Sequence, residues 1–223
     1  MTACFVIGTD TGVGKTRVSV ALLQGLQATH PRTVGMKPVA SGCDWVDGRW
    51  LNDDARQLQA ASTLAVPPAY ANPYAFPAAI APHLAAREAG AVVDLDHIEA
   101  CFHALRQQAD AVVVEGAGGL LVPLNDAGHT LADLAQRLRI PVVLVVGLRL
   151  GCINHALLTQ EALLARRLSL VGWVANALSP DMPHEQANVD TLRQQLQAPL
   201  LAQWAWQPGA APPPLTLPAL QAG

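Results

Sequence analysis

The stretch that decides the fold is residues 8–16, which read GTDTGVGKT. It follows a short apolar run at residues 4–7 and precedes a segment of helical period. A glycine-rich turn between a strand and a helix can aim backbone N–H groups at phosphate oxygens, with the positive end of the helix dipole behind them. Within it, the Lys15 ammonium would reach the terminal phosphates and the Thr16 hydroxyl would bind Mg²⁺. The stretch therefore predicts a phosphate loop that binds ATP.

The loop departs from the strict pattern GxxxxGK followed by Ser or Thr. That pattern places its first glycine at position 9, where this chain has Thr9, and the glycine stands at Gly8 instead. In the partitioning and division-site ATPases the variant loop runs KGGxGKT, with a signature lysine upstream of the main one. Here Asp10 occupies the signature position and no lysine lies nearby, which argues against that class.

Composition restricts the classes of protein to which the chain can belong. Hydrophobic residues make up 51% and charged residues 14%, which is typical of a globular protein. The formal net charge is −3 and no basic block occurs, so we expect no nucleic-acid partner. The longest apolar stretch, around residues 141–148, is too short to span a bilayer, and no leader segment is evident. We expect a cytoplasmic protein with no membrane partner, whose four scattered cysteines are free thiols.

Short apolar runs alternate with segments of helical period, which is the pattern of βαβ units. The sequence predicts an α/β fold of the P-loop NTPase type, a mainly parallel sheet with helices on both faces, in one domain over residues 1–223. The predicted strands are residues 4–7, 33–36, 111–114, 142–146, 170–175 and 200–204. The predicted helices are residues 15–28, 95–108, 131–138, 155–167 and 185–196.

Two segments interrupt this alternation. Residues 65–82 hold five prolines and are predicted to form an ordered loop rather than a helix. The Pro/Ala-rich tail, residues 207–223, is predicted to be an extended coil on the surface or a disordered end. Thr130 and Asp133 are spaced as a capping box, so Asp133 is interpreted as a cap partner rather than a catalytic acid.

Lysine is confined to two positions, Lys15 in the loop and Lys37 in the segment KPVASG. The other twelve basic residues are arginine, which a biased genome would also produce. Lys37 follows the second predicted strand, and the carboxyl ends of parallel strands form the ligand-binding edge of such a sheet. We therefore expect both ammonium groups to face one cleft as catalytic cations, the alternative being that Lys37 merely ends a strand.

Two acidic residues are placed to complete a metal site. Glu115 ends the third predicted strand after four apolar residues, where a carboxylate is costly unless it meets a cation. Asp54 begins a further helix, although N-capping by Asn52 or Asp53 is a competing explanation of that cluster. Mg²⁺ prefers one or two carboxylates together with phosphate oxygens and water. We expect Thr16, Asp54 and Glu115 to hold Mg²⁺ on ATP.

Eight blocks of sequence follow one another along the chain: GTDTGVGKT, KPVASG, NDD, NPY, PH, EGAGG, LGCINH and GWVAN. They run from the first predicted strand to about Asn176, nearly four-fifths of the chain. In content and order they resemble the dethiobiotin synthetases, and KPVASG and LGCINH are the most specific. The resemblance implies that 7,8-diaminononanoate and CO₂ form a carbamate, which takes the γ-phosphoryl group of ATP. The second amine would then close a ureido ring with loss of phosphate.

The resemblance also implies roles for individual residues. Lys37 resembles the catalytic lysine, Ser41 the serine that contacts the substrate, and Asn176 the residue that reads the adenine edge. The implied nucleotide site comprises Gly12, Val13, Gly14, Lys15, Thr16, Arg17, Asp54, Glu115, Gly116, Ala117, Gly118 and Asn176. The implied substrate site comprises Thr11, Ser41, Gly151, Cys152, Ile153 and Asn154.

The segment Gly151, Cys152, Ile153 and Asn154 is interpreted as the start of a helix whose free N–H groups hold the substrate carboxylate. In the family this helix end serves the neighbouring subunit, which implies a homodimer. An ordinary N-cap by Asn154 is the alternative.

The pattern departs from the family after Asn176. Ala205 stands where a proline is expected before Trp206, and no acidic residue follows Asp190. Asn188 is nearest to the position of a substrate-binding tyrosine. These departures leave the base selectivity of the nucleotide site open.

Two other classes are compatible with the loop alone. One is a nucleotide-switched ATPase that recruits partners, against which Asp10 and the KPVASG block both argue. The other is the ATP-dependent half of an amidotransferase, for which no glutaminase segment is evident.

Overall fold

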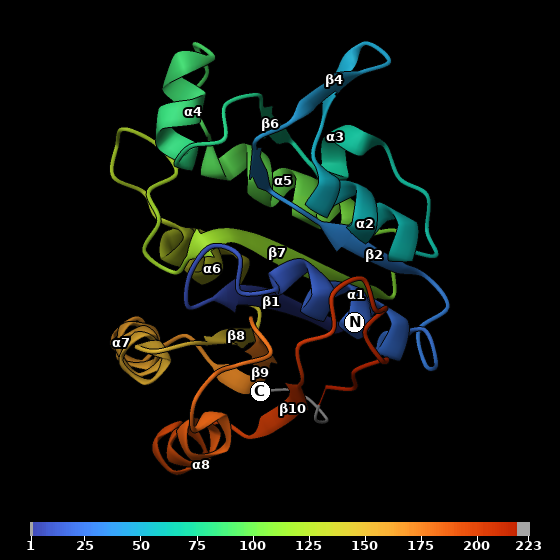
Figure 1. Cartoon of the computed structure of the whole chain (residues 1–223). Coiled ribbons are helices and arrows are strands. Elements are labelled where there is room, and N and C mark those ends of the chain that lie inside the picture. The colour runs from blue at the N-terminus through green and yellow to red at the C-terminus, as the bar shows by residue number, and fades with distance from the viewer. Residues whose placement is uncertain (1, 218–223) are drawn as a thin grey trace.

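Six parallel strands form the central sheet of the computed structural model, in the order β10-β9-β8-β1-β7-β2 (Figure 1). The structure describes residues 2–217, so the last part of the predicted tail, residues 218–223, lies outside the described residues. The strands are β1 (Thr2–Gly8), β2 (Thr33–Met36), β7 (Ala111–Gly119), β8 (Val142–Leu148), β9 (Leu170–Ala177) and β10 (Leu200–Trp204). The parallel α/β fold and its six predicted strands are confirmed.

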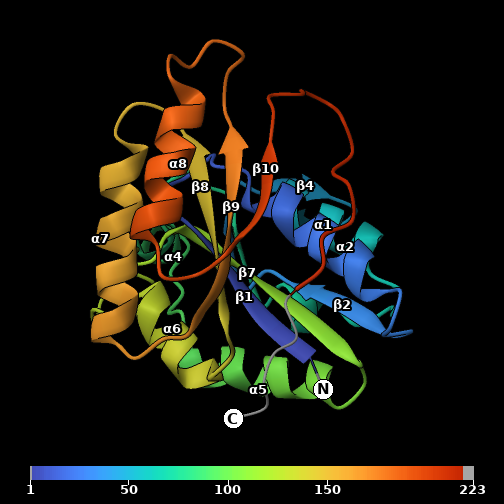
Figure 2. The same cartoon turned by 90° about the horizontal axis from the view of Figure 1, so that it is seen from below.

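Helices cover both faces of this sheet (Figure 2). The helices of one face are α5 (Leu95–Arg106), α6 (Leu131–Leu138), α7 (Cys152–Ala165) and α8 (Glu185–Gln195), and those of the other are α1 (Lys15–Leu26) and α2 (Asp53–Ala61). Along β1, Phe5 and Ile7 pack toward the first group while Cys4 and Val6 pack toward the second, because successive side chains of a strand alternate. No helix among residues 2–217 is long and apolar enough to cross a membrane.

The prediction of a loop over residues 65–82 is wrong. Helix α3 (Pro68–Ala71) and strand β6 (Tyr74–Phe76) lie within it, and helix α4 (Pro82–Glu88) begins at its last residue. Pro68 and Pro82 each stand in the first turn of their helix. There a proline needs no N–H donor and its fixed φ angle suits the helix, so proline starts these helices instead of preventing them.

A small subdomain of short strands follows β2. β3 (Val39–Ser41) pairs in parallel with β6, and β4 (Asp44–Val46) pairs with β5 (Arg49–Leu51) as an antiparallel hairpin. The hairpin turns at Asp47 and Gly48, which have φ angles of 49° and 81°, as a two-residue hairpin turn requires. These elements lie beyond the edge strand β2, so the segment after Lys37 leads away from the carboxyl end of β2 (Figure 1).

The tail leaves β10 and runs across α1 (Figure 2), without helix or strand over residues 205–217. The Leu215 N–H donates to the Ala21 carbonyl at 2.9 Å, and the Leu215 side chain is buried. Gly25 is required beneath it, because a Cβ there would lie 2.1 Å from the Leu215 carbonyl oxygen. The predicted surface coil is confirmed for residues 207–217.

Candidate active site

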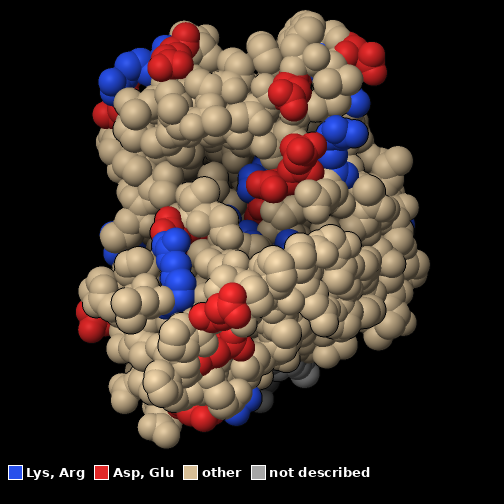
Figure 3. All heavy atoms as spheres, in the orientation of Figure 1, with Lys and Arg blue, Asp and Glu red and all other residues tan. Residues whose placement is uncertain are grey.

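A cavity of about 650 Å³ opens where β1, β2 and β7 end, and it appears as the hollow in the centre of Figure 3. We call it the lysine cavity, because both lysines of the chain line it. The other predicted site residues that line it are Thr11, Gly12, Gly14, Thr16, Ser41, Asp54, Glu115, Ala117 and Gly118. Residues from four separate parts of the sequence are thus brought to one edge of the sheet, as predicted.

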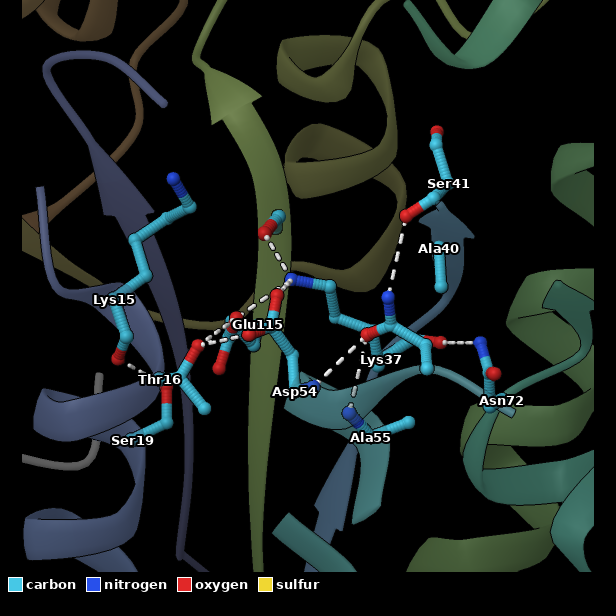
Figure 4. A network of polar contacts seen from close by, with 12 residues as sticks. Lys15, Thr16, Ser19, Lys37, Ala40, Ser41, Asp54, Ala55, Asn72 and Glu115 are labelled. Atoms are coloured by element: carbon cyan, nitrogen blue, oxygen red, sulfur yellow. Dashed lines mark hydrogen bonds and ion pairs between the residues drawn. The ribbon is translucent and has the colours of Figure 1, made fainter. Parts of the chain in front are cut away.

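The phosphate loop forms the floor of the lysine cavity. Gly14 is the N-cap of α1 with a φ angle of 96°, and a Cβ there would lie 2.4 Å from Nδ2 of Asn176. Both the left-handed backbone and the close approach require glycine. The Lys15 ammonium donates to the Asp10 carbonyl at 3.0 Å and points away from the carboxylates of the cavity (Figure 4). Burial, together with the nearby Lys37 charge, lowers the pKa of Lys15 to about 8.

Lys37 lies at the centre of a buried polar network (Figure 4). Its ammonium donates to Oε1 of Glu115 at 2.6 Å, to Oδ2 of Asp54 at 2.8 Å and to the Gly116 carbonyl at 3.2 Å, which uses all three of its N–H groups. Burial alone would lower the pKa of Lys37, but the charges of Glu115 and Asp54 outweigh it and raise the pKa. Lys37 is therefore a firmly held cation.

The predicted metal ligands converge on the same network. The Thr16 hydroxyl lies 2.8 Å from Oδ1 of Asp54 and 3.0 Å from Oε1 of Glu115. Burial would raise the pKa of Asp54, but Lys37 and then the Thr16 hydroxyl lower it, so the carboxylate is ionised. Of the two expected capping residues, Asn52 and not Asp53 caps α2, since the Asn52 side chain accepts the N–H groups of Asp54 and Ala55. Asn52 therefore caps the helix, while Asp54 is left to contact Lys37 and Thr16.

Glu115 lies within its strand and does not end it, which corrects the predicted boundary. β7 continues to Gly119, which pairs with Gly8 of β1, and the Lys37 ammonium neutralises the Glu115 carboxylate, which is fully buried. Oε2 of Glu115 is buried and has no hydrogen-bond partner among the described residues. An unpaired buried carboxylate oxygen beside Asp54 and Thr16 is suited to a hard cation.

Two positioning residues were not predicted. Asn72, of the NPY block, donates to the Lys37 carbonyl at 2.7 Å and so fixes the backbone that carries the ammonium (Figure 4). Arg149 forms an ion pair with Asp10, whose other carboxylate oxygen accepts the Thr11 N–H at 2.7 Å. This hydrogen bond and then Arg149 lower the pKa of Asp10. The NPY block was a signal for Asn72, whereas nothing in the sequence links Arg149 to a residue so far upstream.

Comparison with known proteins agrees with this geometry. Residues 2–213 match the family described as an AAA domain. The chain is 50% identical over 210 residues to the ATP-dependent dethiobiotin synthetase BioD of Aromatoleum aromaticum, which covers 94% of this chain and 93% of that relative. It is 54% identical over 201 residues to the protein of the same name from Xylella fastidiosa, covering 89% and 88% of the two chains. The chain belongs to the ATP-dependent dethiobiotin synthetase family.

Solved structures of more distant proteins share the fold of this dethiobiotin synthetase family member. A ParA family ATPase from Chlorobium tepidum has a TM-score of 0.56 at 11% identity, covering 92% of this chain and 84% of that one. The septum site-determining protein MinD from Pyrococcus horikoshii has a TM-score of 0.53 at 14% identity, covering 93% and 82%. These likenesses establish a P-loop NTPase fold, and the identities are too low to carry function.

Arg17 and Asn176 lie outside the lysine cavity. Arg17 faces a second cavity of about 690 Å³, which Trp206, Gln207 and the following residues of the tail enclose against α1 and α2. We call it the tail cavity. Asn176 is buried between the cavities, where its Nδ2 donates to the Val13 carbonyl at 2.9 Å. Val13 itself packs in the core, and Gly116 contributes only its carbonyl to Lys37.

The predicted carboxylate-binding turn lies apart from both cavities. Gly151 is the N-cap of α7 with a φ angle of 94°, so the alternative of a cap by Asn154 is wrong. The Cys152 side chain is buried, with Sγ 4.0 Å from Oδ1 of Asn188 on α8, while the neighbouring Leu150 is almost fully exposed. Among the described residues that line the lysine cavity, none comes from residues 151–154.

Proposed function

We propose that this chain is an ATP-dependent ligase that converts 7,8-diaminononanoate, CO₂ and ATP into dethiobiotin, ADP and phosphate in biotin synthesis. The observation that carries the proposal is the lysine cavity. There Lys15, Lys37, Ser41, Asp54 and Glu115, which the sequence places far apart, face one space. Membership of the dethiobiotin synthetase family supports the same reaction.

The proposed reaction has three steps. One amine of the substrate adds to CO₂ and loses a proton, which gives a carbamate. A carbamate oxygen attacks the γ-phosphorus of ATP and ADP leaves, so a carbamic-phosphoric anhydride forms. The second amine attacks the carbonyl carbon of this anhydride and loses a proton, the bond from that carbon to the phosphate oxygen breaks, phosphate leaves with the proton, and the ureido ring closes. Each step gathers negative charge on oxygen, so positioned cations are the main catalytic requirement.

Lys15 and Lys37 meet this requirement at two places. Lys15 is on the phosphate loop and serves the transferring phosphoryl group. Lys37 is held by Glu115 and Asp54 beside the open space lined by Ser41, where it serves the carbamate. Ser41 contacts the substrate in this proposal, and Thr11 borders it.

The cavity residues fit Mg²⁺. The two ammonium groups and the carboxylates of Asp54 and Glu115 sum to zero net charge, so MgATP brings its own cation to a neutral site. Thr16, Asp54 and the unpaired Oε2 of Glu115 would hold the ion. When bound, Mg²⁺ would neutralise charge on the β- and γ-phosphate oxygens.

The nucleoside of ATP belongs in the tail cavity in this proposal. Arg17 follows the phosphate-loop Thr16 directly and lines the tail cavity, so a nucleotide with its phosphates on the loop reaches it. Leu178 and Trp206 offer apolar and aromatic surface for stacking. Asn176 stands between the phosphates and the base.

A homodimer completes the substrate site in this proposal. In the turn at residues 151–154 the Cys152 N–H already donates to the Arg149 carbonyl, so the N–H groups of Ile153 and Asn154 would serve a carboxylate. Leu150, just before the turn, is exposed, and the turn does not line its own lysine cavity. A second copy would bring this turn, with Asn188 close behind it, to the substrate carboxylate. The reaction draws on ATP and small metabolites, so we propose a cytoplasmic location. That the chain forms one domain stays a prediction.

The direct test is phosphate release from MgATP and bicarbonate, with and without 7,8-diaminononanoate, with the product identified by mass. We expect release that depends on the diamine and a product heavier than the diamine by one carbonyl group less two hydrogens. ATP turnover indifferent to the diamine would leave a P-loop ATPase and contradict the proposal. A variant at the exposed ion pair of α2, Arg56→Met, is a suitable control because Arg56 lines neither cavity.

A further inference from the structure

Arg17 is the one charged side chain among the described residues that line the tail cavity. Its guanidinium carbon lies 5.0 Å from the centre of the Trp204 ring, and its Nη1 donates to Oδ1 of Asn176 at 3.3 Å. Its Nε is buried and has no hydrogen-bond partner among residues 2–217. Because Nε has no exposed surface, an acceptor on a ligand in the tail cavity would be met by the Nη groups, of which only Nη1 has an acceptor among the described residues.

The contact with Arg17 also fixes the orientation of the Asn176 side-chain amide. Its Nδ2 donates to the Val13 carbonyl at 2.9 Å, while its Oδ1 accepts from Arg17. A carbonyl needs a donor and a guanidinium needs an acceptor, so the two partners agree on one orientation of the amide. The acceptor that would take the 6-amino group of adenine is therefore engaged by Arg17.

The two purines present different edges to such a donor. Guanine has two adjacent acceptors, O6 and N7, whose spacing matches the fork of an arginine. Adenine offers the N7 acceptor beside a 6-amino donor, which competes with Arg17 for Asn176. Stacking on an aromatic wall such as Trp206 does not discriminate between them.

We propose that Arg17 sets the base selectivity of the nucleotide site, so that GTP serves as a phosphoryl donor alongside ATP. The inference rests on the proposed function in one respect, that the nucleoside occupies the tail cavity. The chemistry of transfer is unchanged, since GTP gives up the same γ-phosphoryl group and leaves as GDP.

The test compares ADP and GDP binding by isothermal titration calorimetry in the wild-type chain, in Arg17→Met and in Arg17→Lys. Arg17→Met keeps an unbranched side chain over Trp204 and removes all donors, whereas Arg17→Lys keeps the charge and removes the fork. We expect the wild-type Kd for GDP to lie within about tenfold of that for ADP. In both variants the GDP affinity relative to ADP falls, by roughly 10- to 100-fold in Arg17→Met.

Diamine-dependent phosphate release with GTP and with ATP is the parallel readout, and Arg56→Met again removes an arginine outside both cavities. A wild-type chain that binds ADP more than about a hundredfold tighter than GDP would overturn the proposal. So would an unchanged GDP-to-ADP ratio in Arg17→Met, or in Arg17→Lys if the first variant does not fold.

The two proposals fail separately. Dethiobiotin formed from ATP with an unchanged ratio in the Arg17 variants removes this inference and leaves the function. A chain that makes no product from the diamine loses the proposed function, and the GDP and ADP affinities still decide the role of Arg17.

Discussion

The lysine cavity and the tail cavity adjoin the same end of α1 but differ in what holds them. In the lysine cavity, Lys37 and Glu115 form a buried ion pair, and Lys37 also pairs with Asp54, whose side chain is 40% exposed. In the tail cavity, Arg17 is the only charged group among the described lining residues, and the walls come from small, apolar and amide side chains. One cavity is built by charge, and the other by the packing of a distant segment.

This difference indicates how well each cavity tolerates amino-acid substitution. A buried charge that loses its partner is destabilised by several kcal/mol, so the lysine cavity permits few residue types. Apolar and aromatic walls accept substitutions of similar volume, so the tail cavity can vary while the nucleotide still stacks. The departures from the family pattern, Ala205 and the lack of an acidic residue after Asp190, fall on the tolerant side.

The substitution with the largest expected effect on the lysine cavity is Lys37→Ala. We expect turnover to fall by ~10²–10³, the scale for the loss of one transition-state donor. The free energy of unfolding should fall by about 3–5 kcal/mol as well, because the fully buried Glu115 carboxylate is left without its cation. Phosphate release and chemical denaturation measure the two effects, and calorimetry should find ATP binding largely retained. Near-normal turnover in the folded variant would remove Lys37 from its role.

The pH dependence of ATP binding tests the start of α1, which both cavities share and where Lys15 lies. Burial lowers the pKa of Lys15 to about 8 in the free protein, and bound phosphates would raise it again by supplying negative charge. Affinity for ATP should therefore be fully present below pH 8. It should fall as pH rises through 8, by up to about tenfold per pH unit.

Calorimetric titrations from pH 7 to 9.5 measure this effect. In Lys15→Ala the Kd for ATP should be roughly 10- to 100-fold higher at pH 7, since a charge-assisted hydrogen bond is lost. The fall in affinity above pH 8 should disappear in that variant. An Ala variant with unchanged affinity would contradict the assignment of the phosphate loop.

The central sheet could be predicted from the sequence because its signals are local. The apolar runs of β2 and β10 were predicted with the boundaries that the structure has, and Thr130 and Asp133 form the predicted capping box. The prolines were misread, because Pro68 and Pro82 begin helices and a count of prolines does not tell a first-turn position from a break. The boundary at Glu115 failed for another reason, since β7 pairs with β1 as far as Gly119 and the distant Lys37 neutralises the buried charge within the strand.

The residues of the candidate site also divide into those with a local sequence signal and those that depend on distant contacts. That Lys15, Thr16, Asp54 and Glu115 line one cavity could be predicted, because few residue types suit phosphate and metal. The ion pair of Asp10 with Arg149 could not, because it depends on how two loops meet in space. The tail cavity was not predicted either, since a proline-rich coil carries no pattern that says where it packs.

The gentlest test addresses the wall of the tail cavity. Leu215 is buried against α1, and its backbone passes over Gly25, so these two residues hold the tail in place. Leu215→Ala removes the side chain, and Gly25→Ala adds a Cβ that would lie 2.1 Å from the Leu215 carbonyl oxygen. Both should weaken ATP binding by roughly threefold to tenfold, since the tail would be packed against α1 for a smaller fraction of the time. Turnover at saturating ATP should change little, because neither residue lines the lysine cavity.

Calorimetry with ATP and phosphate release at saturating ATP separate the two effects of these variants. Leu215→Met, which conserves volume, is the matched control and should bind ATP as the wild type does. If Leu215→Ala and Gly25→Ala also keep wild-type affinity, the tail does not form part of the nucleotide site. In that case Arg17 would act on the base without help from the tail. A loss of turnover at saturating ATP would instead show that the two cavities are coupled through α1. The two cavities could then not be treated as independent.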